Sequence, residues 1–234
     1  HEQLPVSADR RFDWFGAALY AAGFGALVGG LAAVARSGAG KWVIAAGAVA
    51  FGLFLVRDRL SARPIVPARL FRDPVFTFSN LAALLNYSAT FAVGYLLSLY
   101  LQVVRGLPPR HAGLLLLAQP LTMALLSPLA GRLSDRFQPR VPASLGMALT
   151  ALSLFLFALL GPATPLAVVV GTLLLIGVGF ALFSSPNTNA VMSAVDRRDY
   201  SVASAVLGTM RQLGQSLSMA ALALLTARTM GEAQ

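Results

Sequence analysis

Long apolar stretches alternate with short polar segments along this chain of 234 residues. A helix needs about 20 mostly apolar residues to cross the hydrocarbon core of a bilayer. Seven stretches meet or approach that length and are predicted to span a membrane: Phe15–Val34, Lys41–Val56, Ser79–Leu101, Ala112–Ala130, Val141–Leu160, Leu166–Val195 and Val202–Ala227. The pattern therefore predicts an all-α fold, a polytopic transmembrane helical bundle with about seven spans.

The composition favours a membrane protein over a water-soluble one. Apolar residues make up 57% of the chain and charged residues only 12%, and the mean hydropathy is +0.72. A soluble domain carries about 25% charged residues. Half of that fraction leaves too little polar surface to cover a globule in water, so we expect an integral membrane protein.

The placement of positive charge predicts the orientation of the chain. The net charge of +9 would suggest nucleic acid in a soluble protein, but no basic helix face is interleaved with stacking aromatic side chains. We therefore expect no nucleic-acid partner. If the N-terminus is cytoplasmic, twelve of the 18 lysines and arginines lie in inside segments: Arg10, Arg11, Arg57, Arg59, Arg63, Arg69, Arg72, Arg132, Arg136, Arg140, Arg197 and Arg198. The outside segments hold five: Arg36, Lys41, Arg105, Arg110 and Arg228. Because positive residues favour cytoplasmic loops, this split predicts a cytoplasmic N-terminus for this segment.

Arg211 is the ionisable residue that lies well inside a predicted span. A charge within the hydrocarbon is costly and is a functional hypothesis by default. Alternating spacings of four and three residues place a polar stripe on one face of this helix: Ser204, Gly208, Arg211, Gln215 and Ser218. A polar stripe must face protein or water, so Arg211 either contacts a substrate or gate in a cavity, or it pairs with helix-end carbonyls and snorkels to the cytoplasmic surface.

Other polar side chains lie within the remaining predicted spans. The sixth span contains Pro186, which cannot donate a backbone hydrogen bond. Its polar neighbours, Asn187 among them, either re-satisfy the freed carbonyls or mark a hinge beside a polar cavity. Asn86, Tyr87 and Gln119 are further candidates for a cavity, and each could instead make an interhelical hydrogen bond.

The sequence lacks the residues that nucleophilic, metal-binding and phosphate-binding sites require. The chain has no Cys, and its two histidines, His1 and His111, lie outside the predicted spans, so no Ser–His pair or metal cluster can be built in the bundle. No Gly-rich loop with Lys and Ser or Thr is present to cradle phosphates. We therefore predict no catalytic residues, no metal and no cofactor, and a protein that is not an enzyme. No Asp or Glu lies inside a predicted span, so an acid for ion coupling is expected outside these 234 residues.

The segment from Gly131 to Arg140 resembles the inter-helix signature of the major facilitator superfamily. The matching residues are Gly131, Leu133, Asp135, Arg136 and Arg140. Gln138 stands where the signature has a second Gly, and Pro139 replaces a basic residue. The resemblance implies that Gly131, Asp135, Arg136 and Arg140 form a motif for conformational switching at the cytoplasmic side.

Further segments are similar to the fourteen-span drug:proton antiporters of the EmrB/QacA type. They are residues 12–20, 70–85, 113–136 and 204–225, so the resemblance covers essentially the whole chain. It implies spans seven to thirteen of fourteen, and divides the chain into a cytoplasmic loop (1–14), two linker spans (15–56), a second cytoplasmic loop (57–78) and an incomplete C-terminal transport half of five helices (79–234).

The resemblance also implies a function. We expect the C-terminal portion of a proton-coupled multidrug or solute exporter that works by alternating access in the inner or plasma membrane. Its expected partners are a small-molecule substrate, protons, the lipid bilayer and the missing N-terminal half, with a periplasmic adaptor left open. On polarity and depth, the expected substrate cavity is formed by Asn86, Tyr87, Gln119, Asn187, Arg211 and Gln215. The alternative is a seven-span membrane receptor or sensor, complete as given.

Overall fold

The regular structure of the chain is helical, as the hydrophobic pattern predicts. The computed structural model describes residues 13–34, 39–61 and 64–231, without the side chains of Asp135 and of residues 227–231. All regular elements in these ranges are helices. The described chain divides into two compact units between Ala68 and Arg69. The predicted all-α helical bundle is therefore confirmed.

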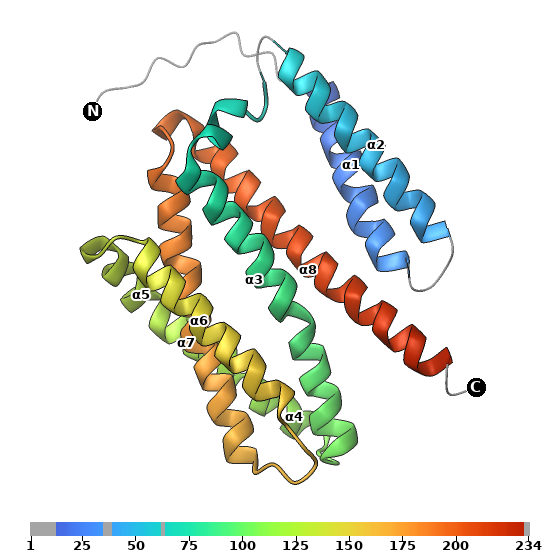
Figure 1. Ribbon diagram of the computed structural model, residues 1–234, viewed down its shortest axis with the longest axis vertical. Coiled ribbons are helices and arrows are strands. Elements are labelled where there is room, and N and C mark those ends of the chain that lie inside the picture. Colours follow the sequence, from blue (N-terminus) through green and yellow to red (C-terminus); the bar gives the residue numbers. More distant parts are fainter. Residues whose placement is uncertain (1–12, 35–38, 62–63, 232–234) are drawn as a thin grey trace. The chain divides into compact units, whose positions relative to one another are not determined.

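Unit 1 is a hairpin of two long helices. Helix α1 comprises Trp14–Ala33, helix α2 comprises Ala39–Leu60, and the two pack against each other along their lengths (Figure 1). The packing is close because glycines lie at the contact. A Cβ atom on Gly47 would lie 2.6 Å from the backbone nitrogen of Leu27. Small residues of this kind allow helix backbones to approach each other in lipid.

One end of unit 1 is fastened by carboxylates. Asp13 caps α1 by accepting a hydrogen bond from the Gly16 N–H (2.9 Å), and its Oδ1 also accepts from Nη2 of Arg57 (3.0 Å). The hydrogen bond from Arg57, followed by that from Gly16, holds the pKa of Asp13 below its usual range. Asp58 is buried and accepts from the backbone N–H groups of Ile65 (2.6 Å) and Val66 (3.0 Å), which secures the chain after α2.

Unit 2 contains the other predicted spans. Its elements, with a short 3₁₀ turn (η1) at the boundary between the units, are η1 (Ala68–Arg72), α3 (Pro74–Leu99), the π-helical turn η2 (Tyr100–Val104), α4 (Pro109–Leu116), α5 (Ala118–Arg136), α6 (Arg140–Ala158), α7 (Leu166–Ser193), η3 (Arg197–Asp199) and α8 (Tyr200–Gly231). Helix α3 begins five residues before the predicted span, because Asp73 accepts from the Phe76 N–H (3.0 Å) and Pro74 stands at the helix start.

Helix α7 is the centre of unit 2. Helices α5 and α6 pack on it, α3 pairs with α8, and α3 and α8 also contact α7 (Figure 1). Half of the apolar stretch of α7 is buried, against 6% for the stretch Pro109–Ser134 that includes α4 and most of α5. The α6–α7 contact needs glycine, since a Cβ atom on Gly146 would lie 2.5 Å from the backbone nitrogen of Phe183.

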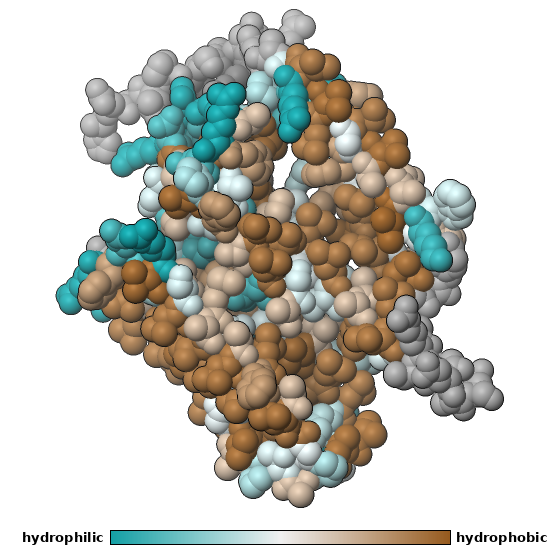
Figure 2. Space-filling model, in the orientation of Figure 1, coloured by the Kyte–Doolittle hydropathy of each residue, from teal (hydrophilic) through white to brown (hydrophobic). Residues whose placement is uncertain are grey.

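The outer surface of unit 2 is that of a membrane protein. Six helices among the described residues are long and apolar enough to cross a membrane: α1, α2, α3 with η2, α4 with most of α5, α6 and α7. Apolar residues cover much of the face of the molecule that Figure 2 shows. On α5, Leu121 is 57% exposed and Leu125 75% exposed. The chain is therefore a multi-pass membrane protein. Helix α8 has the predicted place and length, but Arg211 and its polar neighbours lower its hydropathy, so its role as a seventh span stays a prediction.

The two ends of unit 2 are built differently. The end where α3 stops and α7 starts, which we call the packed end, has a buried apolar cluster formed by Leu97, Leu101, Ala112, Val169 and Leu173. Hydrogen bonds fasten the α6–α7 loop there: the Tyr100 hydroxyl donates to the Gly161 carbonyl (2.9 Å), and Arg105 Nη1 donates to the Thr164 carbonyl (2.8 Å). At the other end, where α3 and α6 start and α7 stops, lies a cavity, and we call it the pocket end.

Candidate functional site

Arg211 lies at a junction of three helices in unit 2. Its Nη2 donates a hydrogen bond to Oγ1 of Thr188 on α7 (2.7 Å), and its guanidinium carbon is 5.8 Å from the ring centroid of Tyr87 on α3. The Tyr87 ring in turn packs edge-on against Phe180 of α7, with 5.8 Å between the ring centroids. A cation at this distance from an aromatic face is attracted by the ring quadrupole. We call Tyr87, Phe180, Thr188 and Arg211 the arginine cluster.

The hydrogen bonds around Arg211 leave part of its side chain unsatisfied. The Thr188 hydroxyl donates to the Ser184 carbonyl (2.8 Å), so it accepts from Arg211 while stabilising the backbone before Pro186. The Arg211 Nε is buried without a hydrogen-bond partner, and among the described residues no carboxylate forms an ion pair with Arg211. A buried donor of this kind costs about 1–3 kcal/mol until it meets an acceptor. The guanidinium can therefore bind an acceptor that the described residues of unit 2 do not supply.

The polar stripe of α8 lies along the edge of the contact with α3, which covers only part of the stripe. The buried side of α8 includes Ala203, Leu207 and Gly214, and a Cβ atom on Gly214 would lie 2.5 Å from the Leu84 carbonyl of α3. In the stripe, Ser204 and Gly208 are exposed, and Arg211 and Gln215 are half-buried. Ser218 is buried, and its Oγ accepts a hydrogen bond from the Ala92 N–H (2.9 Å). The stripe therefore presents most of its polar surface outside unit 2.

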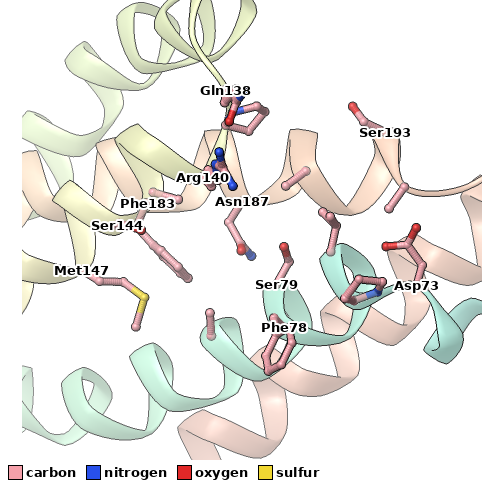
Figure 3. Close-up of a pocket in the computed structure, with 17 residues that line it drawn as sticks. Asp73, Phe78, Ser79, Gln138, Arg140, Ser144, Met147, Phe183, Asn187 and Ser193 are labelled. Carbon is pink, nitrogen blue, oxygen red and sulfur yellow. The ribbon is translucent and has the colours of Figure 1, made fainter.

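The pocket end contains a separate cavity of about 740 Å³. It is lined by the start of α3, the start of α6 and the last turns of α7, with Asn187, Arg140 and Ser79 among its polar residues (Figure 3). Phe78, Met147 and Phe183 supply apolar wall. Asn187 is 3% exposed, and its Nδ2 has no hydrogen-bond partner.

The structure brings together some of the predicted cavity residues and separates others. Tyr87 and Arg211 meet in the arginine cluster, whereas Asn187 faces the cavity at the pocket end with Arg140. Thr188, the residue after Asn187, is the one that reaches Arg211, because successive side chains on a helix point about 100° apart.

The remaining predicted cavity residues belong neither to the arginine cluster nor to the lining of the cavity at the pocket end. Asn86 is buried on α3 with its Oδ1 unpartnered, and Gln119 is half-buried at the close contact between α5 and α7. Gln215 follows Arg211 by one turn on the stripe of α8.

The predicted switch motif lies across the turn from α5 to α6. A Cβ atom on Gly131 would lie 3.2 Å from Oγ of Ser185 on α7, so this glycine marks a close approach of α5 and α7. Nearby, Asn189 of α7 donates to Oγ of Ser134 (2.6 Å). Arg136 is exposed at the end of α5, while the side chain of Asp135 lies outside the described residues.

Two parts of these sites cannot be read from the sequence pattern. In the sequence, Phe180 does not differ from the other apolar residues of α7, and only the tertiary structure places it against Tyr87. Arg140 reads as a loop charge, yet it lines the cavity. Among the described residues, no group of three His, Cys, Asp or Glu side chains could hold a metal ion.

Comparison with known proteins extends these observations. The chain is similar to the uncharacterized transporter YebQ of Escherichia coli, at 36% identity over 95% of this chain and 50% of that protein. It is also similar to the riboflavin transporter RibZ of Clostridioides difficile, at 30% identity over 74% of this chain and 38% of that protein. The multidrug resistance protein Stp of Mycobacterium tuberculosis is 30% identical over 91% of this chain and 40% of that protein. The chain spans half or less of the length of these relatives.

The sequence also matches a family over most of its length. Residues 11–219 match the Major Facilitator Superfamily. This result agrees with the helical bundle, with the apolar belt and with the signature-like segment between α5 and α6. The chain belongs to the major facilitator superfamily.

Proposed function

We propose that this chain is the C-terminal portion of a proton-coupled exporter of drugs or other small solutes. Family membership and relatives named as transporters support membrane transport and do not favour the receptor or sensor alternative. The finer assignment to the fourteen-span antiporters rests on the resemblance of residues 12–20, 70–85, 113–136 and 204–225. Under this proposal α1 and α2 are linker helices, and the N-terminal half of the transporter supplies the acid that couples protons. The orientation, with a cytoplasmic start of this segment in the inner membrane, is part of the proposal.

The polar stripe of α8 is the observation that carries the proposal. Arg211 and Gln215 are costly to leave in contact with lipid, and Ser204, Gly208, Arg211 and Gln215 all stay at least partly exposed on unit 2. A water-filled cavity shared with a second half of a transporter would satisfy them. Substrate and ion sites in such transporters lie near the bilayer midplane, between the two halves.

Arg211 has the central role in this cavity. Its Nη2 is fixed by Thr188 and its guanidinium lies over Tyr87, while Nε has no partner. We infer that a substrate acceptor, or a carboxylate of the other half, completes the hydrogen bonds of Nε in one conformation of an alternating-access cycle. We infer also that the segment Gly131, Asp135, Arg136 and Arg140 acts in the switch between conformations, because it joins α5 to α6 beside the pocket end.

Substitution of Arg211 tests this role. In a full-length transporter that contains this segment, Arg211→Ala should lower the initial rate of export of a fluorescent drug with carbonyl and carboxylate acceptors, such as norfloxacin, by tenfold or more. The reason is that a charged hydrogen bond contributes about 1.5–3 kcal/mol, and about 1.4 kcal/mol corresponds to a tenfold change in rate. Arg211→Lys should retain part of the rate, since the positive charge stays but the planar fork is lost.

The matched control is Arg110→Gln, which removes one positive charge from an exposed position on α4. It should leave export and membrane abundance unchanged. Export that survives Arg211→Ala at equal abundance would support the snorkelling alternative and contradict a role in the cavity. A full-length protein that exports none of a broad panel of drugs and metabolites would contradict the proposed function itself.

A further inference from the structure

The cavity at the pocket end is large enough for a small-molecule ligand, and the transport proposal assigns it no substrate. Its volume of about 740 Å³ is that of a small-molecule site. Arg211, Tyr87 and Gln215 do not line it. The cavity is therefore a separate site from the polar stripe of α8.

Asn187 points its amide into the cavity, as Figure 3 shows, and carries a donor that the protein does not satisfy. The side chain is 3% exposed and its Nδ2 has no hydrogen-bond partner. Buried polar groups are nearly always hydrogen-bonded in folded proteins. An amide N–H can only donate, so the missing partner is an acceptor.

The surroundings of this donor favour an anionic acceptor. Arg140 begins α6 and lines the cavity on the same side as Asn187 (Figure 3). The first turns of α3 and α6 both border the cavity, and the start of a helix carries partial positive charge. The carboxylate in the lining, Asp73, lies on the opposite side, where its Oδ1 caps α3 by accepting from the Phe76 N–H. The Arg140 side is therefore the place for a negative group.

The rest of the lining favours a ligand with an apolar part. Phe78, Val75, Met147 and Phe183 form apolar wall, and Phe78 is 68% exposed and Val75 51% exposed on the outside of α3. The cavity lies at the ends of membrane-spanning helices, the level at which lipid headgroups meet the hydrocarbon. Basic pockets between transmembrane helices at this level can bind phosphate headgroups.

We propose that the pocket end binds a phosphate-headed amphiphile, a phospholipid of the surrounding membrane. The phosphate accepts hydrogen bonds from Arg140 and from Nδ2 of Asn187, and the acyl chain lies along Phe78 and Met147. A lipid in the cavity contacts α3, α6 and α7. It therefore links these three helices at the pocket end, where the apolar cluster of the packed end has no counterpart. Arg140 also belongs to the proposed switch segment, but lipid binding at this site is measured without a transport assay and does not depend on the transport proposal.

Lipid binding to the purified chain tests the site. Dimyristoylphosphatidylglycerol added to the protein in neutral detergent should raise its apparent melting temperature and be retained as a one-to-one adduct in native mass spectrometry. Dimyristoylglycerol, which has the same chains and lacks the phosphate, should do neither. Inorganic phosphate at millimolar concentration should also have no effect, which distinguishes a lipid headgroup from a free anion.

Two substitutions locate the binding, and one serves as control. Arg140→Gln and Asn187→Leu should each weaken retention of the phospholipid by tenfold or more, whereas Arg132→Gln, an equal loss of charge outside the cavity, should keep it. Because Arg140 is exposed, its variant is expected to fold even if that of Asn187 is not. Equal retention by Arg140→Gln and Arg132→Gln would overturn the proposal. So would stabilisation by dimyristoylglycerol or by phosphate alone that matches that by the phospholipid.

Discussion

The two ends of unit 2 differ in how fully they are filled. At the packed end, Leu101 and Val169 are 0% exposed inside an apolar cluster, and Tyr100 and Arg105 fasten the α6–α7 loop to the end of α3. At the pocket end, the same helices surround a cavity of about 740 Å³, and Asn187 keeps an unsatisfied donor. One set of helices thus has a well-packed end and an incompletely packed one.

This difference indicates where the unit can move. Well-packed side chains transmit displacement as a rigid body, while regions with few buried apolar contacts open at lower free energy. Under the proposed function, we expect the packed end to hold the helices together while the pocket end changes its spacing during the alternating-access cycle. The predicted switch segment, from Gly131 to Arg140, lies beside the end with spare volume.

The largest expected effect comes from breaking the packed end. Leu101→Ala should lower the free energy of unfolding by about 2–3 kcal/mol, because it leaves a cavity among fully buried neighbours. The matched change near the pocket end, Leu145→Ala at a leucine that is 51% exposed, should cost less than about 0.5 kcal/mol. Unfolding of both variants by sodium dodecyl sulfate, followed by circular dichroism, measures the difference. Equal losses would contradict the contrast between the ends.

A smaller effect is expected from the ion pair beside the pocket end. Arg69 Nη2 donates to both carboxylate oxygens of Asp199 (3.0 and 2.8 Å), and so links the start of unit 2 to the α7–α8 turn. Asp199→Asn should cost about 1 kcal/mol of unfolding free energy, since the Arg69 side chain is 47% exposed and partly screened. Asp196→Asn is the control, because the Asp196 side chain is 64% exposed and lies 3.9 Å from Arg69. A double-mutant cycle with Arg69→Gln isolates the pair, and a coupling energy of zero would refute this link.

The smallest effect is expected from the partly exposed Arg57–Asp13 pair in unit 1, whose side chains are 39% and 25% exposed. It serves as a reference for the Arg69–Asp199 pair in unit 2. The Arg57 hydrogen bond lowers the pKa of Asp13 below its ordinary value of 3.8. The stabilisation is therefore present above about pH 4 and is lost as the pH falls through the lowered pKa. Thermal unfolding between pH 3 and pH 6 should show a slightly steeper loss at low pH in the parent than in Asp13→Asn. Superimposable pH profiles would exclude a stabilising role for this carboxylate.

Much of the fold could be predicted from the sequence, because length and hydropathy alone decide whether a helix suits a membrane. Each of the seven predicted spans is represented by helical structure. The ends of the helices were harder to predict. The start of α3 lies within the polar segment before the predicted span, where Asp73 and Pro74 provide a cap that outweighs the local charges. The π-helical turn at Tyr100 depends on contacts with the α6–α7 loop, which no local pattern contains.

The site could be predicted only in part. Arg211 was found because a charge in an apolar helix stands out in any sequence, but its partners Tyr87 and Thr188 come from two other helices. The separation of Asn187 from Arg211 follows from tertiary packing, since polarity alone does not say which neighbour each side of α7 faces. The cavity at the pocket end was not expected, because both charged residues of its lining, Asp73 and Arg140, lie outside the predicted spans.

The central claim is that the polar stripe of α8 faces water inside a transporter, and cysteine reactivity tests it most directly. This segment contains no Cys, so in a full-length transporter whose other cysteines have been replaced each introduced thiol is the single one. Gly208→Cys is suitable because a Cβ atom there meets nothing within 4 Å, and Leu152→Cys on α6, at a leucine that is 47% exposed, is the lipid-facing control. A thiol in apolar surroundings ionises poorly and reacts slowly. We predict that Gly208→Cys reacts with a charged, membrane-impermeant maleimide at least about tenfold faster than Leu152→Cys. Equal, slow reaction at both positions would contradict the account.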